Sequence, residues 1–366
     1  MSSRNSPRIY IVNSHQEHRE QLHKVLARLY NVISFEDNQS VIEAMRLKLP
    51  DLVIVDDRVL ENGRGCLTDK RNDEALSGVP FIITGNSLPA DVLGPDSASE
   101  LDAYLSRPFS KNQLFTRIGD QLSRGTEQAW EQLPDLEKSA LQRTVEDFLV
   151  LSDAIEAKEP LNISETSESC QPLVEAINNN RIQGVLDGVK GHHNYTYVHS
   201  LRVATYLSVF GHAIGMRDDE LLTLSTGGLL HDVGKMVTPQ DILNKPSKLE
   251  GDDWEIMKSH VDHTKDILDR TPDVNAGIVI IAMQHHEKLD GTGYPQGLAG
   301  KELSELARMA GIVDIFSALT DERAYKPAFP AEKAFAILAD LGDKMDQKLI
   351  KVFRHTLETA HVYAHV

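Results

Sequence analysis

The sequence predicts a two-part chain, with an α/β doubly wound domain followed by an all-α helical bundle. Short apolar runs alternate with segments of helical periodicity from residue 8 to about residue 118. From residue 191 onward helix follows helix with no convincing strand, and 366 residues suffice for two cores. We therefore expect a first domain at 1–120, a helical linker at 121–190 and a helical domain at 191–366.

Five short apolar runs predict the strands of the first domain. They are IYIV at 9–12, VISF at 32–35, LVIV at 52–55, FIIT at 81–84 and AYL at 103–105. Helical spacing between them is typical of a doubly wound parallel sheet, in which ligands bind beyond the carboxyl ends of the strands. The residues expected at that edge are Asp56, Asp57, Thr84 and the Arg107-Pro108 corner.

The linker is polar but carries an apolar stripe at helical spacing. Its members are Leu136, Leu141, Val145, Phe148, Leu149 and Ile155. Two interpretations are open: the stripe pairs with a second copy of the chain in a homodimer, or it packs against the domain that follows. The Ser- and Glu-rich segment 159–171 is expected to contain a loop.

The last part of the chain predicts a succession of helices. Their expected ranges are 197–214, 218–230, 251–268, 273–286, 303–320, 331–341 and 347–361. Such a bundle can direct ligands inward from several helices at once.

Composition and charge narrow the range of partners. A formal charge of −17 argues against binding a nucleic-acid polymer, because that affinity comes largely from Lys and Arg contacts to phosphates. The apolar runs are too short for a bilayer and no signal-peptide core is evident, so we expect a cytoplasmic protein that does not bind membranes. Cys66 and Cys170 lie too far apart in the sequence to indicate a disulfide framework.

Two stretches repeat one arrangement, in which an apolar helix ends in histidine and a glycine-containing turn follows. They are LLHDVGK at 229–235 and HHEKLDGTGYPQG at 285–297. A single such pair is more often an ordinary polar helix end, but the two together indicate a metal site. The candidate ligands lie in or at the ends of apolar helices, and they are His199, His231, Asp232, His260, His285, His286 and Asp314. With Asp232 bridging, this set leaves open positions on two octahedral cations, as two-metal hydrolysis of a phosphodiester requires.

Residues 195–325 resemble the HD-GYP family of metal-dependent phosphohydrolases, which degrade the bacterial messenger cyclic di-GMP. The resemblance rests on HDVGK, on HHEKLDGTGYP and on the surroundings of His199, His260 and Asp314. It implies that the seven candidates hold two divalent cations, Fe or Mn, and that Asp232 and Lys235 are catalytic. It further implies that Lys235 contacts the scissile phosphate and that Tyr294, Arg323 and Lys326 bind the substrate.

Some positions depart from the family pattern. Tyr195 and Ser317 stand where some members have acidic ligands for a third metal, so the resemblance implies two metals here. His263 and the pair His192-His193 match no motif and are expected at the surface.

The first third of the chain resembles the receiver domain of response regulators. Asp56 aligns with the phosphorylated aspartate, but Asn13-Ser14 replaces the acidic pair that holds Mg²⁺, and Arg107 replaces a lysine. We interpret this part as a pseudo-receiver that docks signalling proteins or dimerises. The alternative is a receiver that is phosphorylated by an unusual route.

These features favour an enzyme that opens cyclic di-GMP to linear pGpG and, in a further step, to GMP. The main alternative is a non-catalytic effector that binds cyclic di-GMP or a partner protein. A broader HD nucleotidase would leave the residues of the GYP loop unexplained.

Overall fold

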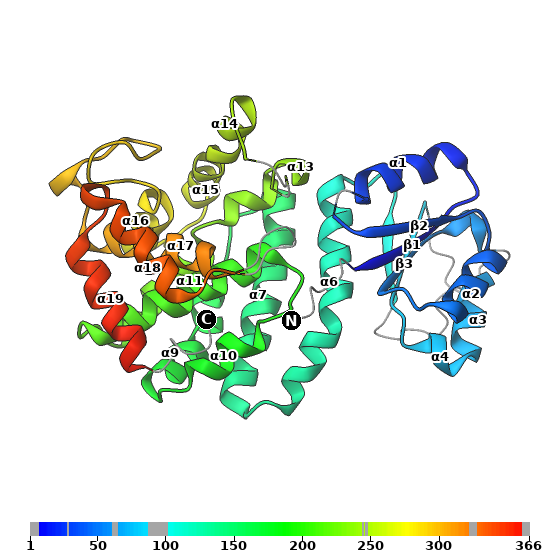
Figure 1. Cartoon of the computed structure of the whole chain (residues 1–366), viewed down its shortest axis with the longest axis horizontal. Helices are drawn as coiled ribbons and strands as arrows, with labels where there is room; N and C mark the ends of the chain where they lie inside the picture. Colours follow the sequence, from blue (N-terminus) through cyan, green and yellow to red (C-terminus); the bar gives the residue numbers. More distant parts are fainter. Residues whose placement is uncertain are drawn as a thin grey trace. The chain divides into compact units, whose positions relative to one another are not determined.

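The computed structural model describes residues 7–27, 29–60, 65–86, 102–243, 245, 248–321 and 328–360. The chain divides into two compact units, Met1–Arg124 and Gly125–Val366. The first holds a β-sheet and the described part of the second is helical, apart from an isolated bridge between Asp290 and Ala299 (Figure 1). The predicted fold class, a doubly wound domain followed by a helical bundle, is therefore confirmed.

The sheet of the first unit has five parallel strands in the order β2-β1-β3-β4-β5, the order of flavodoxin-like doubly wound folds. The strands are β1 (Arg8–Val12), β2 (Asn31–Phe35), β3 (Leu52–Asp56), β4 (Phe81–Gly85) and β5 (Asp102–Ser106). The helices are α1 (Gln16–Leu26), α2 (Asn38–Leu47), α3 (Gly65–Asn72), α4 (Glu74–Ser77) and α6 (Lys111–Ala129), with a 3₁₀ turn at Asp57–Val59. All five apolar runs singled out in the sequence are strands.

Successive side chains along each strand point to opposite faces of the sheet, so the core of this unit has two layers. Ile9 and Ile54 face α1 and α6, whereas Tyr10 and Val53 face α2, α3 and α4. Helices thus cover both faces of the sheet, which explains why its central strands are apolar throughout.

The residues expected at the carboxyl edge of the sheet do meet there, around Asp56. This buried carboxylate accepts a hydrogen bond from Asn13 Nδ2 at 2.9 Å, from Arg58 Nε at 2.9 Å and from Arg107 at 2.5 Å. The same Arg107 nitrogen donates to Thr84 O at 3.0 Å and lies 3.6 Å from Asp57 Oδ1. Burial would raise the pKa of Asp56, but Arg58 and then Arg107 lower it. The side chain is therefore an ionised carboxylate, and both of its oxygens already accept hydrogen bonds.

We expect Asp56 to remain unmodified when the protein is incubated with a small phosphodonor and Mg²⁺. Two guanidinium groups hold the carboxylate that would have to attack phosphorus, and Asn13 stands where a metal ligand is needed. Intact-mass measurement followed by peptide mapping checks this. A stable phosphate adduct on Asp56 would instead support the receiver that is phosphorylated by an unusual route.

The second unit is a helical bundle around one large core. Its first helices are α7 (Asp135–Ala157), α8 (Ile163–Ser169), α9 (Gln171–Asn178), α10 (Ile182–Gly188), α11 (Tyr195–Ala213), α12 (Asp218–Leu230) and α13 (Gln240–Leu243). They are followed by α14 (Asp252–Lys258), α15 (His260–Asp269), α16 (Ala276–Gln284), α17 (Glu305–Thr320), α18 (Ala331–Asp340) and α19 (Gln347–Thr359). Short 3₁₀ turns lie at Trp130–Gln132, Val233–Val237, Gly300–Glu302 and Gly342–Lys344.

The apolar stripe of the predicted linker lies on α7 and faces inward. Leu141, Val145 and Phe148 belong to the large core that also contains residues of α11 and α17, and Ile155 belongs to a second cluster beside it. Of the two interpretations, packing against the following domain is therefore confirmed. Only the far side of α7 remains open to solvent, for example at Val150, which is 58% exposed.

The loop expected within 159–171 is confirmed at residues 159–162. It ends where Asn162 Oδ1 accepts a hydrogen bond from Glu165 N at 3.3 Å and starts helix α8. Another local expectation was wrong. The helix expected at 251–268 is divided at Ser259, whose hydroxyl donates to Ile256 O at 2.8 Å. Such a bond competes with the helical ladder, and here it accompanies a break that makes His260 the first residue of α15.

Replacing Asp147 with asparagine should stabilise the protein at neutral pH. Asp147 is mostly buried on α7. Its Oδ1 accepts a hydrogen bond from Thr166 Oγ1 at 3.3 Å, whereas its Oδ2 is buried with no hydrogen-bond partner among the described residues. Burial raises its pKa from 3.8 to about 6, so the folded state holds the proton more tightly than the unfolded state. The stabilisation is complete below about pH 4 and is lost as the pH rises through 6.

The free energy of unfolding of Asp147→Asn should therefore exceed that of wild type by about 1–3 kcal/mol at pH 7.5, with little difference near pH 4. Urea unfolding at the two pH values measures this. Asp153→Asn, on the exposed side of the same helix, is the matched control. A less stable Asp147→Asn at pH 7.5 would show that the ionised carboxylate is well accommodated.

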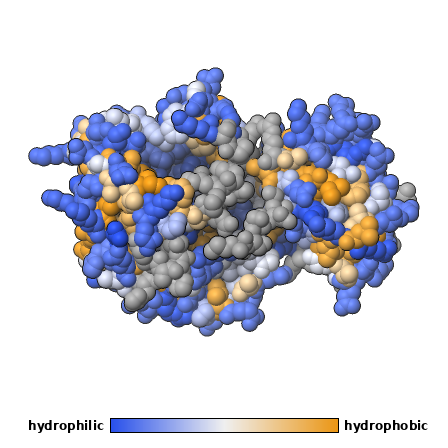
Figure 2. Space-filling view, in the orientation of Figure 1, coloured by the Kyte–Doolittle hydropathy of each residue, from blue (hydrophilic) through white to orange (hydrophobic). Residues whose placement is uncertain are grey.

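The described face of both units is mainly hydrophilic, with apolar residues in separate patches (Figure 2). Among the described residues, no helix combines the length and the apolar character needed to cross a bilayer.

Candidate metal centre

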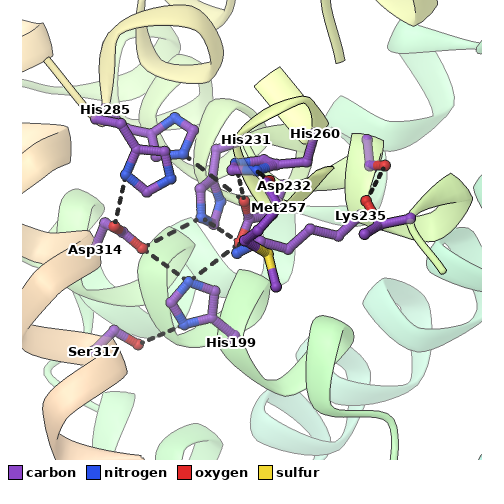
Figure 3. Close-up of polar contacts among 12 residues, drawn as sticks. His199, His231, Asp232, Lys235, Met257, His260, His285, Asp314 and Ser317 are labelled. Carbon is purple, nitrogen blue, oxygen red and sulfur yellow. Dashed lines mark hydrogen bonds and ion pairs between the residues drawn. The ribbon is translucent and has the colours of Figure 1, made fainter. Parts of the chain in front are cut away.

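Five helices or helix ends bring the predicted ligands together. His199 lies in α11, which begins at Asn194, where the side-chain oxygen accepts a hydrogen bond from Tyr197 N at 3.1 Å. Asp314 lies in α17, while the other ligands lie at helix ends: His231 and Asp232 follow α12, His260 opens α15, and His285 and His286 follow α16. Ligands at helix ends can converge on one point from different directions, as they do in Figure 3.

Asp232 is at the centre of the cluster, and its two oxygens face different histidines. Oδ2 lies 3.2 Å from His231 Nε2 and 3.4 Å from His199 Nε2. Oδ1 lies 3.3 Å from His260 Nε2 and 3.8 Å from His285 Nε2. The ligand atoms form two groups that share this residue, His199-His231-Asp232-Asp314 and Asp232-His260-His285-His286. This is the arrangement that a carboxylate bridging two cations requires.

The histidine rings are oriented by backbone carbonyl groups. Nδ1 of His231 is 2.7 Å from Gly228 O, that of His260 is 2.6 Å from Met257 O, and that of His285 is 2.9 Å from Ala282 O. Each carbonyl can accept a hydrogen bond from Nδ1–H, and in a neutral ring that holds its proton on Nδ1 the lone pair is on Nε2.

The atoms that point into the cluster have no hydrogen-bond partner among the described residues. They are Nε2 of His231, His260 and His285 and Oδ1 of Asp232, and all are buried. A buried polar atom without a partner is costly, whereas two divalent cations, one in each group, would satisfy all four. The residues present therefore fit a pair of divalent metal ions.

The protonation states agree with this fit. Burial would raise the pKa of Asp232, but His231 and Lys235 hold it well below its usual range, so it is an anion. Burial, reinforced by His231, lowers the pKa of His285 to about 3, and burial also lowers that of His286. Although burial opposes it, Asp232 raises the pKa of His231 to about 9, because the buried carboxylate attracts positive charge. A metal ion would replace that proton.

Two further predicted residues adjoin the cluster. Lys235 forms an ion pair with Asp232 Oδ2, and its side chain is 18% exposed whereas that of Asp232 is fully buried. Tyr294 stacks on His286 with ring centroids 4.6 Å apart. Both lie where a ligand bound at the cluster would meet them.

Glycine at position 234 allows the turn after Asp232 to approach α15. A Cβ atom there would meet His260 O at 2.0 Å, and Gly234 N donates to Thr264 Oγ1 at 3.0 Å. Any larger residue would push apart two segments that each carry a ligand, which gives the glycine of HDVGK a physical reason.

Sequence analysis missed Glu287 as a site residue. It is 5% exposed, and its oxygens accept hydrogen bonds from Gln296 N at 2.7 Å, Gly297 N at 3.1 Å and Leu298 N at 3.1 Å. Gly293 lies against it so closely that a Cβ atom would be 2.4 Å from Glu287 Cα. Glu287 thereby holds the loop that carries Tyr294. Its place directly after two histidines was the available signal.

Some predicted residues have other outcomes. Arg323 and Lys326 lie outside the described residues. The ring centroids of Tyr195 and His199 are 6.1 Å apart, and Ser317 Oγ is 3.5 Å from His199 Nδ1. The two positions at which acidic third-metal ligands are replaced therefore do adjoin the cluster.

The expectation of a surface position was wrong for His192, which is 8% exposed. Its Nε2 lies 2.9 Å from Glu127 Oε1 and its ring stacks on Trp130.

With this geometry established, comparison with known proteins identifies the family. A family model described as an HD domain matches residues 150–349, which is more than half of the 366 residues. The chain therefore belongs to the HD domain family. Within it, the His231-Asp232 pair and the Gly293-Tyr294-Pro295 loop assign the chain to the HD-GYP branch, as the sequence predicted.

Two curated relatives match less than half of the chain. A cyclic di-GMP phosphodiesterase of Pseudomonas aeruginosa is 35% identical over 159 residues, covering 43% of this chain and 38% of that protein. A 3′3′-cGAMP-specific phosphodiesterase of Vibrio cholerae is 40% identical over 146 residues, covering 40% of this chain and 32% of that protein. The matched region is thus well under half of either relative.

Two further similarities extend over most of the chain. A probable cyclic di-GMP phosphodiesterase of Vibrio cholerae is 26% identical over 365 residues, covering 94% of this chain and 76% of that protein. A solved HD-GYP-type protein from Bdellovibrio bacteriovorus aligns with a TM-score of 0.50 at 18% identity, covering 68% of this chain and 81% of that one. The latter shows the fold alone.

Proposed function

We propose that the chain is a metal-dependent phosphodiesterase that hydrolyses cyclic di-GMP to linear pGpG and, in a further step, to GMP. The observation that carries this proposal is the pair of ligand groups that share Asp232, with buried ring nitrogens that lack any other partner among the described residues. A module that only binds a ligand has no need of such a centre. The names of the relatives support the substrate class.

Each residue of the site has a proposed part in this reaction. The ligands are His199, His231, Asp232, His260, His285, His286 and Asp314, and they would hold two Fe or Mn ions. Bound cations would lower the pKa of a water molecule and offset the charge of the phosphate. Lys235, next to Asp232, would contact the attacked phosphate, and Tyr294 would line the substrate side of the centre. Arg323 and Lys326 remain predicted contacts to guanine or phosphate.

A second candidate substrate is 3′3′-cGAMP. The relative that is 40% identical over 146 residues carries that specificity in its name. Both compounds are cyclic purine dinucleotides, so the same dinuclear centre would serve either one. The choice between them would depend on residues that touch the bases.

Anaerobic purification, metal analysis and product chromatography test the proposal together. We expect close to two Fe or Mn ions per chain and conversion of cyclic di-GMP to a linear product. Parallel reactions with 3′3′-cGAMP rank the two substrates. If the fully metal-loaded protein binds cyclic di-GMP but yields no linear product from either compound, the effector hypothesis replaces the enzyme.

Partners of the chain also remain predictions. A homodimer through the linker would have to use the outer side of α7, because its apolar stripe is buried within the unit. The receiver-like unit is proposed to dock signalling proteins, since Asp56 is already engaged by two arginines.

A further inference from the structure

The two tryptophans of the chain have opposite environments. Trp130 is 1% exposed in the core, whereas Trp254, on α14, is 40% exposed. In Figure 1, α14 lies at the outer edge of the helical unit, next to α15. A large aromatic side chain left open beside a candidate active centre is a potential contact for a flat ligand.

Ring contacts connect Trp254 with the metal centre. Its ring centroid is 6.0 Å from that of Tyr294, at an interplanar angle of 83°. On its other side Tyr294 stacks on His286, a predicted ligand, with centroids 4.6 Å apart. Two rings that meet at nearly a right angle form a corner, in which a flat base can lie on one ring with its edge against the other.

Helix α14 is also tied to the centre. Lys258 Nζ lies 5.9 Å from the centroid of Tyr294 and 3.0 Å from Glu255 Oε1, so the side of the corner is occupied by an ion pair of the same helix. The carbonyl of the adjacent Met257 accepts the 2.6 Å hydrogen bond from His260. The helix that carries Trp254 therefore also orients one of the candidate ligands.

We infer that Trp254 and Tyr294 form a stacking corner for one purine base of the substrate, with Trp254 favouring purines over pyrimidines. This inference rests on the proposed function. A phosphate held at the metal centre places its base one ribose away, and aromatic rings bind bases through their π faces. The competing explanation is that Trp254 only covers Tyr294 and keeps its loop in position.

Kinetics of three variants separate these explanations. Trp254→Ala should raise KM for cyclic di-GMP about tenfold, the effect of losing one base–aromatic stack, with kcat within about twofold of wild type. Trp254→Phe should recover most of the affinity. Ile256→Ala is the matched control, because Ile256 is 39% exposed on the same helix and has no ring that could stack on a base.

Binding before turnover gives an independent measurement. Rapid mixing of metal-loaded protein with cyclic di-GMP should change the fluorescence of wild type, through Trp254, before product forms, and leave that of Trp254→Phe nearly unchanged. Cyclic di-UMP should bind wild type more weakly, and Trp254→Ala should reduce the difference between the two ligands.

Three results would overturn the inference. They are a lower kcat and melting temperature with unchanged KM in Trp254→Ala, equal losses for cyclic di-GMP and cyclic di-UMP, and wild-type turnover without any fluorescence change. A ligand-dependent change that is lost in Trp254→Phe supports the inference even if no product forms. In that case only the proposed phosphodiesterase activity fails.

Discussion

Asp232→Ala should lose both metal ions together and reduce phosphodiester hydrolysis on the order of a thousandfold or more, because the centre supplies several kcal/mol of transition-state stabilisation. Each oxygen of Asp232 faces a different pair of histidines, so one substitution removes a ligand from both groups. Metal content per folded chain is the direct measurement. Circular dichroism establishes that the helices remain.

The helical unit provides a matched control for this substitution. Asp269 pairs with Lys265 on the surface of α15, with side-chain exposures of 61% and 55%. Asp269→Ala should keep both metals and full activity, because exposed ion pairs contribute little. Asp232→Asn retains one carbonyl oxygen and should hold at most one metal. Full metal occupancy in Asp232→Ala would rule out the bridging role.

Lys235→Ala should lower kcat about a hundredfold or more while changing KM little, because a cation beside the attacked phosphate contributes most when charge develops in the transition state. Lys235 is placed for this by its ion pair with Asp232 and by its partial exposure next to the cluster. Steady-state kinetics on protein of measured metal content check the prediction.

Lys265→Ala is the control for Lys235→Ala, since it removes an ion pair of the same kind from the surface. It should leave kcat and KM unchanged. A Lys235→Ala variant that loses metal, with normal kcat per metal-loaded chain, would show that the lysine acts on Asp232 and makes no contribution at the phosphate.

Four of the candidate ligands were predictable because each carries a local signal. His231-Asp232 and His285-His286 end apolar helices and precede glycine-containing turns, so the letters alone mark helix ends that face a core. Position in space was not predictable in the same way. His199 and Asp314 lie 115 positions apart, and only the packing of α11 against α17 brings Nε2 within 3.0 Å of Oδ1.

Features that depend on backbone groups or on residues distant in the chain could not be predicted from the sequence. The carbonyls of Gly228, Met257 and Ala282 orient three rings, yet a carbonyl group is present at every residue. The burial of His192 depends on Trp130, which is remote in the chain. Likewise the apolar stripe on α7 predicted an apolar helix face but did not indicate which part of the chain packs against it.

The single carboxylate of Glu287 has a consequence for the motions of the loop after Tyr294. Three consecutive amides, of Gln296, Gly297 and Leu298, donate to its two oxygens, so none of them can detach alone without leaving a buried anion less well solvated. Their amide hydrogens are therefore coupled and should exchange with solvent in one opening event. Because Tyr294 belongs to the same loop, that event would also displace the backbone that holds its ring against His286.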